Sequence, residues 1–248
     1  GKMGSVKLPG MCFLRKKLRT EGEVKMGLGN DFFEMIRQMY GVSRLHGYTE
    51  EEIAFLKQKY GKIPEVLEEY YRTAGKTEAF HHTQDMWILP EHLRKWKAFA
   101  ECEDMILLNE NQGVCQAAIL REDFGKADPP VYVSEDGGDG EMSAPSVSEF
   151  LAAALAYEAV FACEYTSEEF YWITEKESEL LESRLEKYPF RMENWISGMA
   201  VTLYHNAPDN LVAVMEMEDG ERQMLYGAVS EESYEKLLAA VAEIGEPV

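Results

Sequence analysis

The chain has 248 residues, of which 46% are hydrophobic and 28% are charged, so it can bury the core of one large domain or two small ones. It carries 45 acidic residues against 25 Lys and Arg, a net charge of −20 at pH 7. Such a charge repels nucleic acids and anionic membranes, and no apolar run approaches the ~18 residues of a membrane-spanning helix. We therefore expect no nucleic-acid or membrane partner.

Residues 1–29 are rich in glycine and hold most of the excess positive charge. They show no sustained periodicity, which predicts a loose basic tail. No apolar stretch follows the basic residues, so the segment does not resemble a signal peptide, and we expect a cytoplasmic protein. Gly1 is not an initiator residue and is expected to be a cloning remnant, with Met3, Met11 or Met26 as the natural start.

Helices are predicted next. Three segments show apolar residues at helical spacing, begin at a favoured capping or first-turn residue and end at glycine: 30–41, 49–61 and 64–75. The first begins at Asn30, and the second begins with the capping box Thr49-x-x-Glu52. A polar loop over 76–86 and a short helix from Pro90 follow, with a strand at 87–89 between them.

Strands dominate the middle of the chain. Residues 105–108 and 114–119 predict two strands joined by a turn at 109–113. Neither strand alternates cleanly, which indicates central strands covered by helices. Residues 131–133 predict a third strand, and the preceding prolines indicate that it starts at or near a sheet edge.

An acidic, glycine-rich loop is predicted at 135–141, and the capping box Ser146-x-x-Glu149 then opens a helix that is apolar on most of its faces and should be well buried. The C-terminal third predicts four further elements: a helix from the capping box Thr174-x-x-Glu177 to Pro189, a strand at 200–205, a hairpin at 211–218 and 223–228 around Asp219-Gly220, and a helix from Ser230 to Gly245.

This mixture predicts an α+β fold with a mainly antiparallel sheet backed by helices. The expected organisation is a loose basic tail at 1–29, a core at 30–165, and a C-terminal hairpin-helix extension at 166–248 that packs on the same core. The sequence does not indicate whether the extension continues the sheet of the core or forms a lobe of its own.

Four segments resemble the SUKH superfamily, the Smi/Knr-type proteins, in order and spacing: IPEVLEEYY at 63–71, LLNENQGV at 107–114, DPPVYV at 128–133 and SVSEFL at 146–151. The resemblance covers roughly residues 48–162. It implies a SUKH-like core without catalytic residues. Bacterial members are thought to be immunity proteins that neutralise toxins, often nucleases, and fungal relatives act as signalling scaffolds. Many members carry a large aromatic residue where this chain has only acidic residues, glycines and one methionine, at 135–142, which implies a different partner.

Acidic residues concentrate between 134 and 182, with thirteen Asp or Glu against one Lys, a net charge of −12. An acidic inhibitor can cover the basic substrate groove of a nuclease toxin, and complementary charge speeds its capture. The alternative is an ordinary solvated face. The candidate partner-binding residues are Glu135, Asp136, Asp139, Glu141, Glu164, Glu168 and Glu169.

Three weaker patterns suggest other chemistry. His81, His82 and Asp85 cluster in a loop, as metal ligands or as surface residues. Asp136, Asp139 and Glu141 lack the spacing of an EF-hand calcium loop. Cys115 is either a nucleophile or, because it lies in an apolar strand, a buried inert thiol.

The four cysteines, Cys12, Cys102, Cys115 and Cys163, contain no Cys-x-x-Cys pair, and we expect free thiols. Because none of these patterns indicates a catalytic or metal-binding site, we expect no enzyme activity, catalytic residue, metal or cofactor. The function expected is neutralisation of a basic toxin by occlusion. A regulatory scaffold for cellular proteins is the alternative, and an enzyme of unrecognised type is a more remote one.

Overall fold

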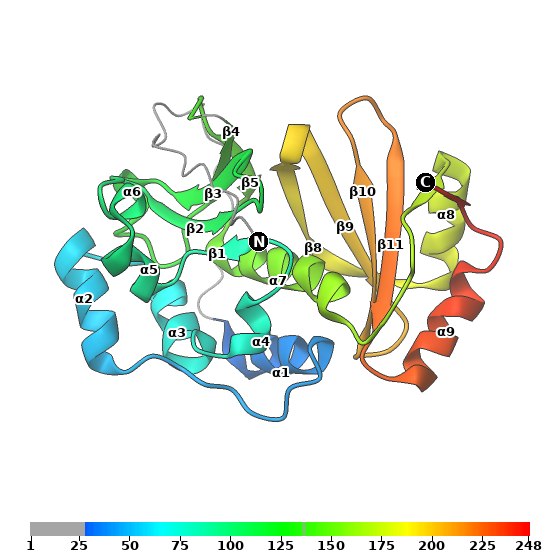
Figure 1. The fold of residues 1–248 in the computed structure, drawn as a ribbon, viewed down its shortest axis with the longest axis horizontal. Helices are drawn as coiled ribbons and strands as arrows, with labels where there is room; N and C mark the ends of the chain where they lie inside the picture. Colours follow the sequence, from blue (N-terminus) through cyan, green and yellow to red (C-terminus); the bar gives the residue numbers. More distant parts are fainter. Residues whose placement is uncertain (1–27, 136) are drawn as a thin grey trace, which may run out of the picture.

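The computed structural model describes residues 28–135 and 137–248, which form an α+β fold with two antiparallel sheets (Figure 1). The predicted fold class is confirmed. Most of the predicted basic tail, residues 1–27, lies outside the described residues. The helices are α1 (Gly29–Met39), α2 (Glu50–Tyr60), α3 (Glu65–Ala74), α4 (Glu78–His81), α5 (Pro90–Lys95), α6 (Lys97–Ala100), α7 (Val147–Ala162), α8 (Glu175–Arg184) and α9 (Glu231–Val241).

Local sequence signals place the first helices well. The Thr49–Glu52 capping box is present in both directions at the start of α2. The first helix was predicted to begin at Asn30, but Asn30 lies inside the first turn of α1, and Leu28 precedes the helix without a capping side chain. Gly41 follows α1 with φ of 62°, a left-handed conformation in which glycine avoids the steric cost of a side chain.

The first sheet has the strand order β1-β2-β3-β4-β5, with every pair antiparallel. Its strands are β1 (Met86–Trp87), β2 (Met105–Asn109), β3 (Cys115–Ile119), β4 (Val131–Glu135) and β5 (Glu141–Ala144). β2 and β3 are internal and buried throughout, as predicted. β4 lies near the edge of the sheet, one strand in from it, because β5 pairs beside it. The predicted loop at 135–141 is wrong at its two ends, because Glu135 belongs to β4 and Glu141 to β5.

The second sheet has the strand order β12-β7-β11-β10-β9-β8, and β6 also pairs with β11. Its strands are β6 (Tyr165–Thr166), β7 (Tyr171–Ile173), β8 (Glu186–Trp195), β9 (Met199–His205), β10 (Asn210–Glu216), β11 (Arg222–Ala228) and β12 (Glu246–Pro247). The predicted helix up to Pro189 is wrong, because α8 ends at Arg184 and Pro189 lies in β8. β8 is an edge strand, where a residue without a backbone N–H is tolerated.

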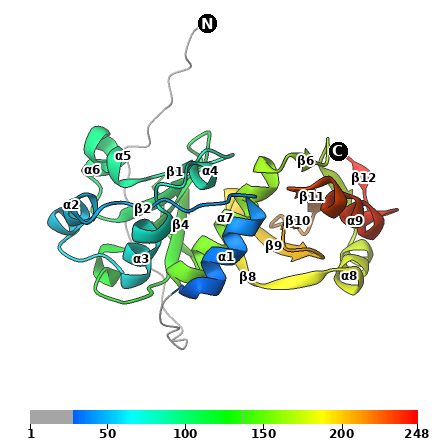
Figure 2. The same ribbon diagram turned by 90° about the horizontal axis from the view of Figure 1, so that it is seen from below.

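Helix α7 forms the centre of the molecule. Ser146 accepts a hydrogen bond from the backbone N–H of Glu149 at its start, and almost all of its residues are buried. It contacts β8, β9, β10 and β11 as well as β5, α1, α3 and α4 (Figures 1 and 2). A helix that is apolar on all sides must be covered on all sides. One hydrophobic core accordingly includes residues of α1, of α7 and of both sheets.

The second sheet is covered on its other face by α8 and α9, which enclose a smaller core containing Leu181, Val212, Met224 and Leu237. Arg184 fastens the two helices together, because its Nη1 donates to the carbonyl oxygens of Ala240 at 2.9 Å and Ala242 at 3.1 Å. The C-terminal segment thus has a sheet of its own and packs on α7 through the face opposite to α8 and α9.

Candidate protein-binding edge

The predicted acidic residues divide into two groups in space. Glu135, Asp139 and Glu141 are exposed on the β4–β5 hairpin, before α7. Glu164, Glu168 and Glu169 are exposed in the segments that flank β6, after α7. Helix α7, about 24 Å long over its 16 residues, lies between the two groups in the chain, and β6 pairs with the end of β11 away from the β10–β11 turn. The structure therefore does not bring the two groups together, and Asp136 lies outside the described residues.

The β4–β5 hairpin meets the second sheet at the turn between β8 and β9. The backbone N–H of Ser197 donates to the Glu135 carboxylate, and Asn194 Nδ2 donates to the carbonyl oxygen of Met142 at 2.9 Å. Asn194 and Ser197 have φ of 56° and 53°, in the left-handed region that most residues avoid. The tight turn brings the ends of the two sheets into direct contact.

A further acidic turn joins this junction from the opposite side. Gly198 lies against the side chain of Glu218, since a Cβ at Gly198 would be 3.6 Å from the Glu218 Cβ. Glu218, Asp219 and Glu221 are exposed in the β10–β11 turn. The three connections lie on one side of the molecule, at the top of Figure 1. We name this surface the acidic edge and define it by six carboxylates: Glu135, Asp139, Glu141, Glu218, Asp219 and Glu221.

Apolar side chains lie among these carboxylates. Cys115 pairs with Glu135 in the β3–β4 ladder, so the neighbouring Val114, 36% exposed, adjoins the acidic edge. Met142, 43% exposed, follows Glu141 on β5. Exposed apolar side chains surrounded by charged ones are the composition expected of a transient protein interface. On β11, the Nε of Arg222 is paired with Glu216 at 2.7 Å.

Three of the six carboxylates of the acidic edge, Glu218, Asp219 and Glu221, were not predicted from the sequence. Asp219-Gly220 was recognised only as a hairpin signal, since nothing local shows that the turn packs beside residues 135–141. A sequence scan finds runs of charge, whereas this surface combines turns about 80 residues apart in the chain. The predicted residues Glu164, Glu168 and Glu169 belong to another part of the surface.

Two buried carboxyl groups lie between α7 and the loop before β1. Glu158, fully buried in α7, accepts hydrogen bonds at its Oε2 from Thr83 Oγ1 at 2.5 Å and from the backbone N–H of Asp85 at 2.9 Å. Asp85 Oδ1 accepts from the backbone N–H of Asn111 at 3.1 Å. Burial first, and then the neighbouring Glu158, raises the pKa of Asp85 to about 8. Burial also raises the pKa of Glu158.

The candidate metal ligands His81, His82 and Asp85, considered beside the alternative of surface residues, do not converge in the structure. His81 is buried and its Nε2 lies 2.7 Å from the Tyr70 hydroxyl, whereas His82 is exposed near Glu78 and Asp85 faces Glu158. Burial lowers the pKa of His81 to about 3, so its ring is neutral. Within the described part of the chain, no group of three or more His, Cys, Asp or Glu side chains is arranged to hold a metal ion.

The cysteines differ from the expectation at one position. Cys115 and Cys163 are free thiols, and burial raises the pKa of both, which disfavours the reactive thiolate. Cys102 is disulfide-bonded, so the expectation of free thiols is wrong for this residue. Cys12 lies outside the described residues.

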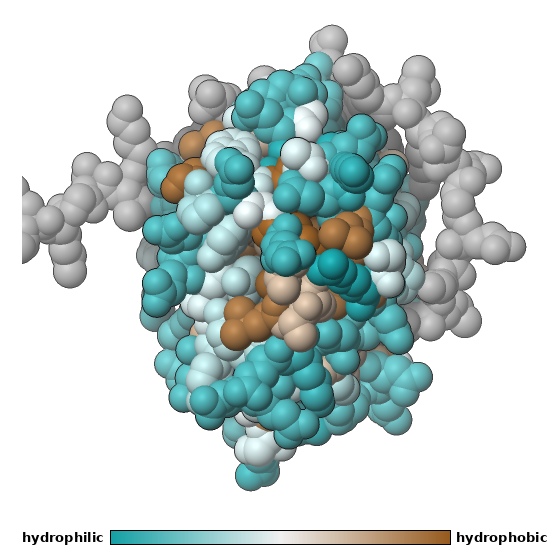
Figure 3. Space-filling model, turned by 90° about the vertical axis from the view of Figure 1, so that its right-hand side faces the viewer, coloured by the Kyte–Doolittle hydropathy of each residue, from teal (hydrophilic) through white to brown (hydrophobic). Residues whose placement is uncertain are grey.

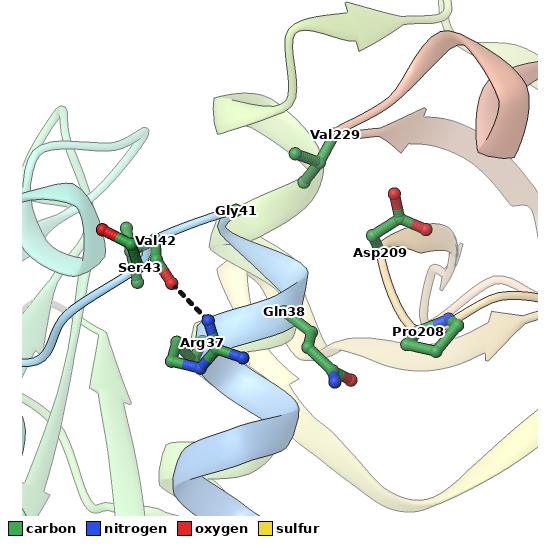
Figure 4. Close-up of a pocket in the computed structure, with 8 residues that line it drawn as sticks. All are labelled: Arg37, Gln38, Gly41, Val42, Ser43, Pro208, Asp209 and Val229. Carbon is green, nitrogen blue, oxygen red and sulfur yellow. Dashed lines mark hydrogen bonds between the residues drawn. The ribbon is translucent and has the colours of Figure 1, made fainter.

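Two other surface features lie away from the acidic edge. An open hollow of about 430 Å³ lies between the end of α1 and the β9–β10 turn (Figure 4). Its polar groups are already bonded, since Arg37 donates to the carbonyl oxygen of Val42 and Asp209 accepts from Ser230. On the α8–α9 side, hydrophobic residues gather within a hydrophilic surround (Figure 3), and Leu180 and Leu238 are 37% and 42% exposed.

A search of protein-family models, curated proteins and solved structures found no match to this chain. Across residues 28–135 and 137–248, no helix combines the length and the apolar character needed to cross a membrane.

Proposed function

We propose that this chain is a non-catalytic, stoichiometric protein-binding protein of the SUKH type, acting in the bacterial cytoplasm as an immunity protein for a basic toxin. The acidic edge occupies the toxin's cationic surface and so occludes it. A nuclease is the favoured class of toxin, because a groove that binds phosphates presents the complementary charge. No cofactor or turnover is involved.

The observation that carries the proposal is the convergence of two acidic turns, β4–β5 and β10–β11, on the β8–β9 turn at the junction of the two sheets. The turns are joined by backbone and side-chain contacts at Ser197, Asn194 and Gly198, so the backbone that carries the carboxylates is positioned before a partner arrives. A preorganised surface avoids part of the ordering cost of binding. The apolar Val114 and Met142 supply area that a partner can bury.

The test is binding of the purified product of the gene next to this one, measured by calorimetry in 150 mM salt. The decisive variant is Glu135→Gln/Asp139→Asn/Glu141→Gln/Glu218→Gln, which removes four charges and keeps side-chain size. The matched control is Glu164→Gln/Glu168→Gln/Glu169→Gln, which removes charge at the other end of α7. We expect 1:1 binding that weakens at least tenfold in the first variant and less than twofold in the control.

The alternative role as a regulatory scaffold predicts a different result. Tagged protein would then capture several housekeeping proteins from its host's lysate and none of the neighbouring product. Equal loss of binding in both variants would also contradict the proposal, because it would indicate a general effect of net charge rather than contact at the acidic edge.

A further inference from the structure

The search for a second function leads to the buried carboxyl pair, which the proposed binding does not use. Glu158 is the one acidic residue in α7 that lies at full burial, and its Oε1 has no hydrogen-bond partner among the described residues. Asp85 is 5% exposed and lies beside it. Two buried carboxyl groups in contact are stable when they share one proton, and they repel when both are ionised.

Within residues 28–135 and 137–248, the groups that shift the pKa of Asp85 and Glu158 include no Lys or Arg. The groups that face the pair are Tyr157 on α7, Tyr40 on α1, Glu110 in the β2–β3 turn and Cys115 on β3. None of these four side chains carries a positive charge. Loss of the shared proton therefore leaves two neighbouring buried negative charges whose repulsion the hydrogen bonds from Thr83 and Asn111 only partly offset, and water entering the site would relieve it.

The element that can move is the loop before β1. Glu158 is held in the central helix, whereas His82 and Gln84 in the loop are exposed and Thr83 is partly so. Asp85 connects this loop to the β2–β3 turn through its hydrogen bond from Asn111. That turn continues into Val114 and Cys115, and Cys115 pairs with Glu135 of the acidic edge.

We propose that Asp85 and Glu158 form a proton-dependent latch, which holds the β2–β3 turn against the acidic edge when they share a proton and releases it when they do not. This regulation rests on the proposed function of the acidic edge. The folded-state pKa of Asp85, about 8, lies above its unfolded value, so the folded protein binds an extra proton. The latch is therefore closed below neutral pH and opens as the pH rises through about 8.

The first test is amide hydrogen exchange of the full chain at pH 7, 8 and 9, corrected for the intrinsic base-catalysed rate. We expect the protection of the Asp85 and Asn111 amides to fall by up to tenfold per pH unit above pH 8. The amide of Val212, in the middle of β10, should keep its protection, which separates local opening from global unfolding. The latch would be overturned if the amides of Asp85, Asn111 and Val114 kept constant protection with pH, as the control amide of Val212 does.

Two variants attribute the effect to the pair. Glu158→Gln and Asp85→Asn each leave a single carboxyl group, so the excess pH dependence at Asn111 should disappear in both. If one variant fails to fold, the hydrogen-exchange measurements on the wild-type protein at pH 7, 8 and 9 still test the latch. Retention of the same pH dependence in either folded variant would assign the opening to another group and refute the latch.

The second test is calorimetry with the neighbouring gene's product at pH 7 and pH 9 in 150 mM salt. Wild-type affinity should fall several-fold between these values, and that of Glu158→Gln should not. An exchange response without a change in affinity overturns the coupling to the acidic edge. Absence of binding at pH 7 overturns the proposed function instead, and the exchange experiment then decides the latch independently.

Discussion

The position of α7 between the two sheets predicts that the protein unfolds as one unit, although the chain has two sheets. Leu155 is fully buried near the middle of this helix. Substitution of a buried leucine by alanine costs about 3–5 kcal/mol where the surroundings cannot collapse, and the slightly better helix propensity of alanine returns only a few tenths. We expect Leu155→Ala to lower the free energy of unfolding by about 3 kcal/mol.

The assay is thermal and urea unfolding, followed by hydrogen exchange in peptides from β2–β3 and from β10–β11. A loss of 3 kcal/mol corresponds to a fall in Tm of about 6–12 °C for a chain of this size. Both sheets should shift together, because one core includes residues of both. Leu180→Ala on α8 is the matched control, and since Leu180 is 37% exposed it should cost less than about 1 kcal/mol.

Two separate transitions, with only one displaced by Leu155→Ala, would refute the reasoning. That result would mean that residues 30–165 and 166–248 fold independently and that the contact of α7 with β8–β11 contributes little.

Three other changes test local features by urea unfolding. Thr174→Ala removes the capping box of α8 and should cost about 1 kcal/mol. Gly227→Ala places a Cβ 2.9 Å from the Cys163 Cβ and should cost about 1–3 kcal/mol, whereas Gly125→Ala meets open space and should be near neutral. Burial holds the pKa of His81 at about 3, below its unfolded value, so the folded state resists protonation and the free energy of unfolding falls as the pH drops below 6.5. His81→Gln should reduce that loss of stability between pH 6.5 and 4.5. An unchanged stability profile in the variant would contradict this explanation.

Local signals predicted the elements whose stabilisation is local. The capping boxes at Thr49 and Thr174 and the hairpin around Asp219-Gly220 were found because each depends on residues only a few positions apart. β5 was missed because residues 141–144 form a strand only by pairing with β4. The start of β8 was assigned to a helix because Pro189 was taken as the helix end, whereas the proline lies on an edge that only the completed sheet defines.

The candidate site shows the same division. Glu135 and Glu141 were selected from a run of charge, and the structure keeps them on one hairpin. Glu218 could not be selected with them, because its position beside Gly198 depends on how the β8–β9 and β10–β11 turns pack. The Asp85–Glu158 pair joins residues 73 positions apart and is likewise invisible to a linear scan.

The two acidic groups at opposite ends of α7 allow contact to be distinguished from long-range attraction. They flank a helix about 24 Å long, while electrostatic screening acts over about 8 Å at 150 mM salt and about 30 Å at 10 mM. At 150 mM salt, neutralising Glu164, Glu168 and Glu169 should leave the association rate of a partner at the acidic edge unchanged, because their field is screened before it reaches that surface. At 10 mM salt the same three changes should slow association, since their field then extends across the molecule.

Stopped-flow association rates for this variant and for the edge variant at both salts measure the difference. An effect of the distant group that persists at 150 mM salt would mean that the partner also touches the segment after α7, and the binding surface would then extend beyond the acidic edge.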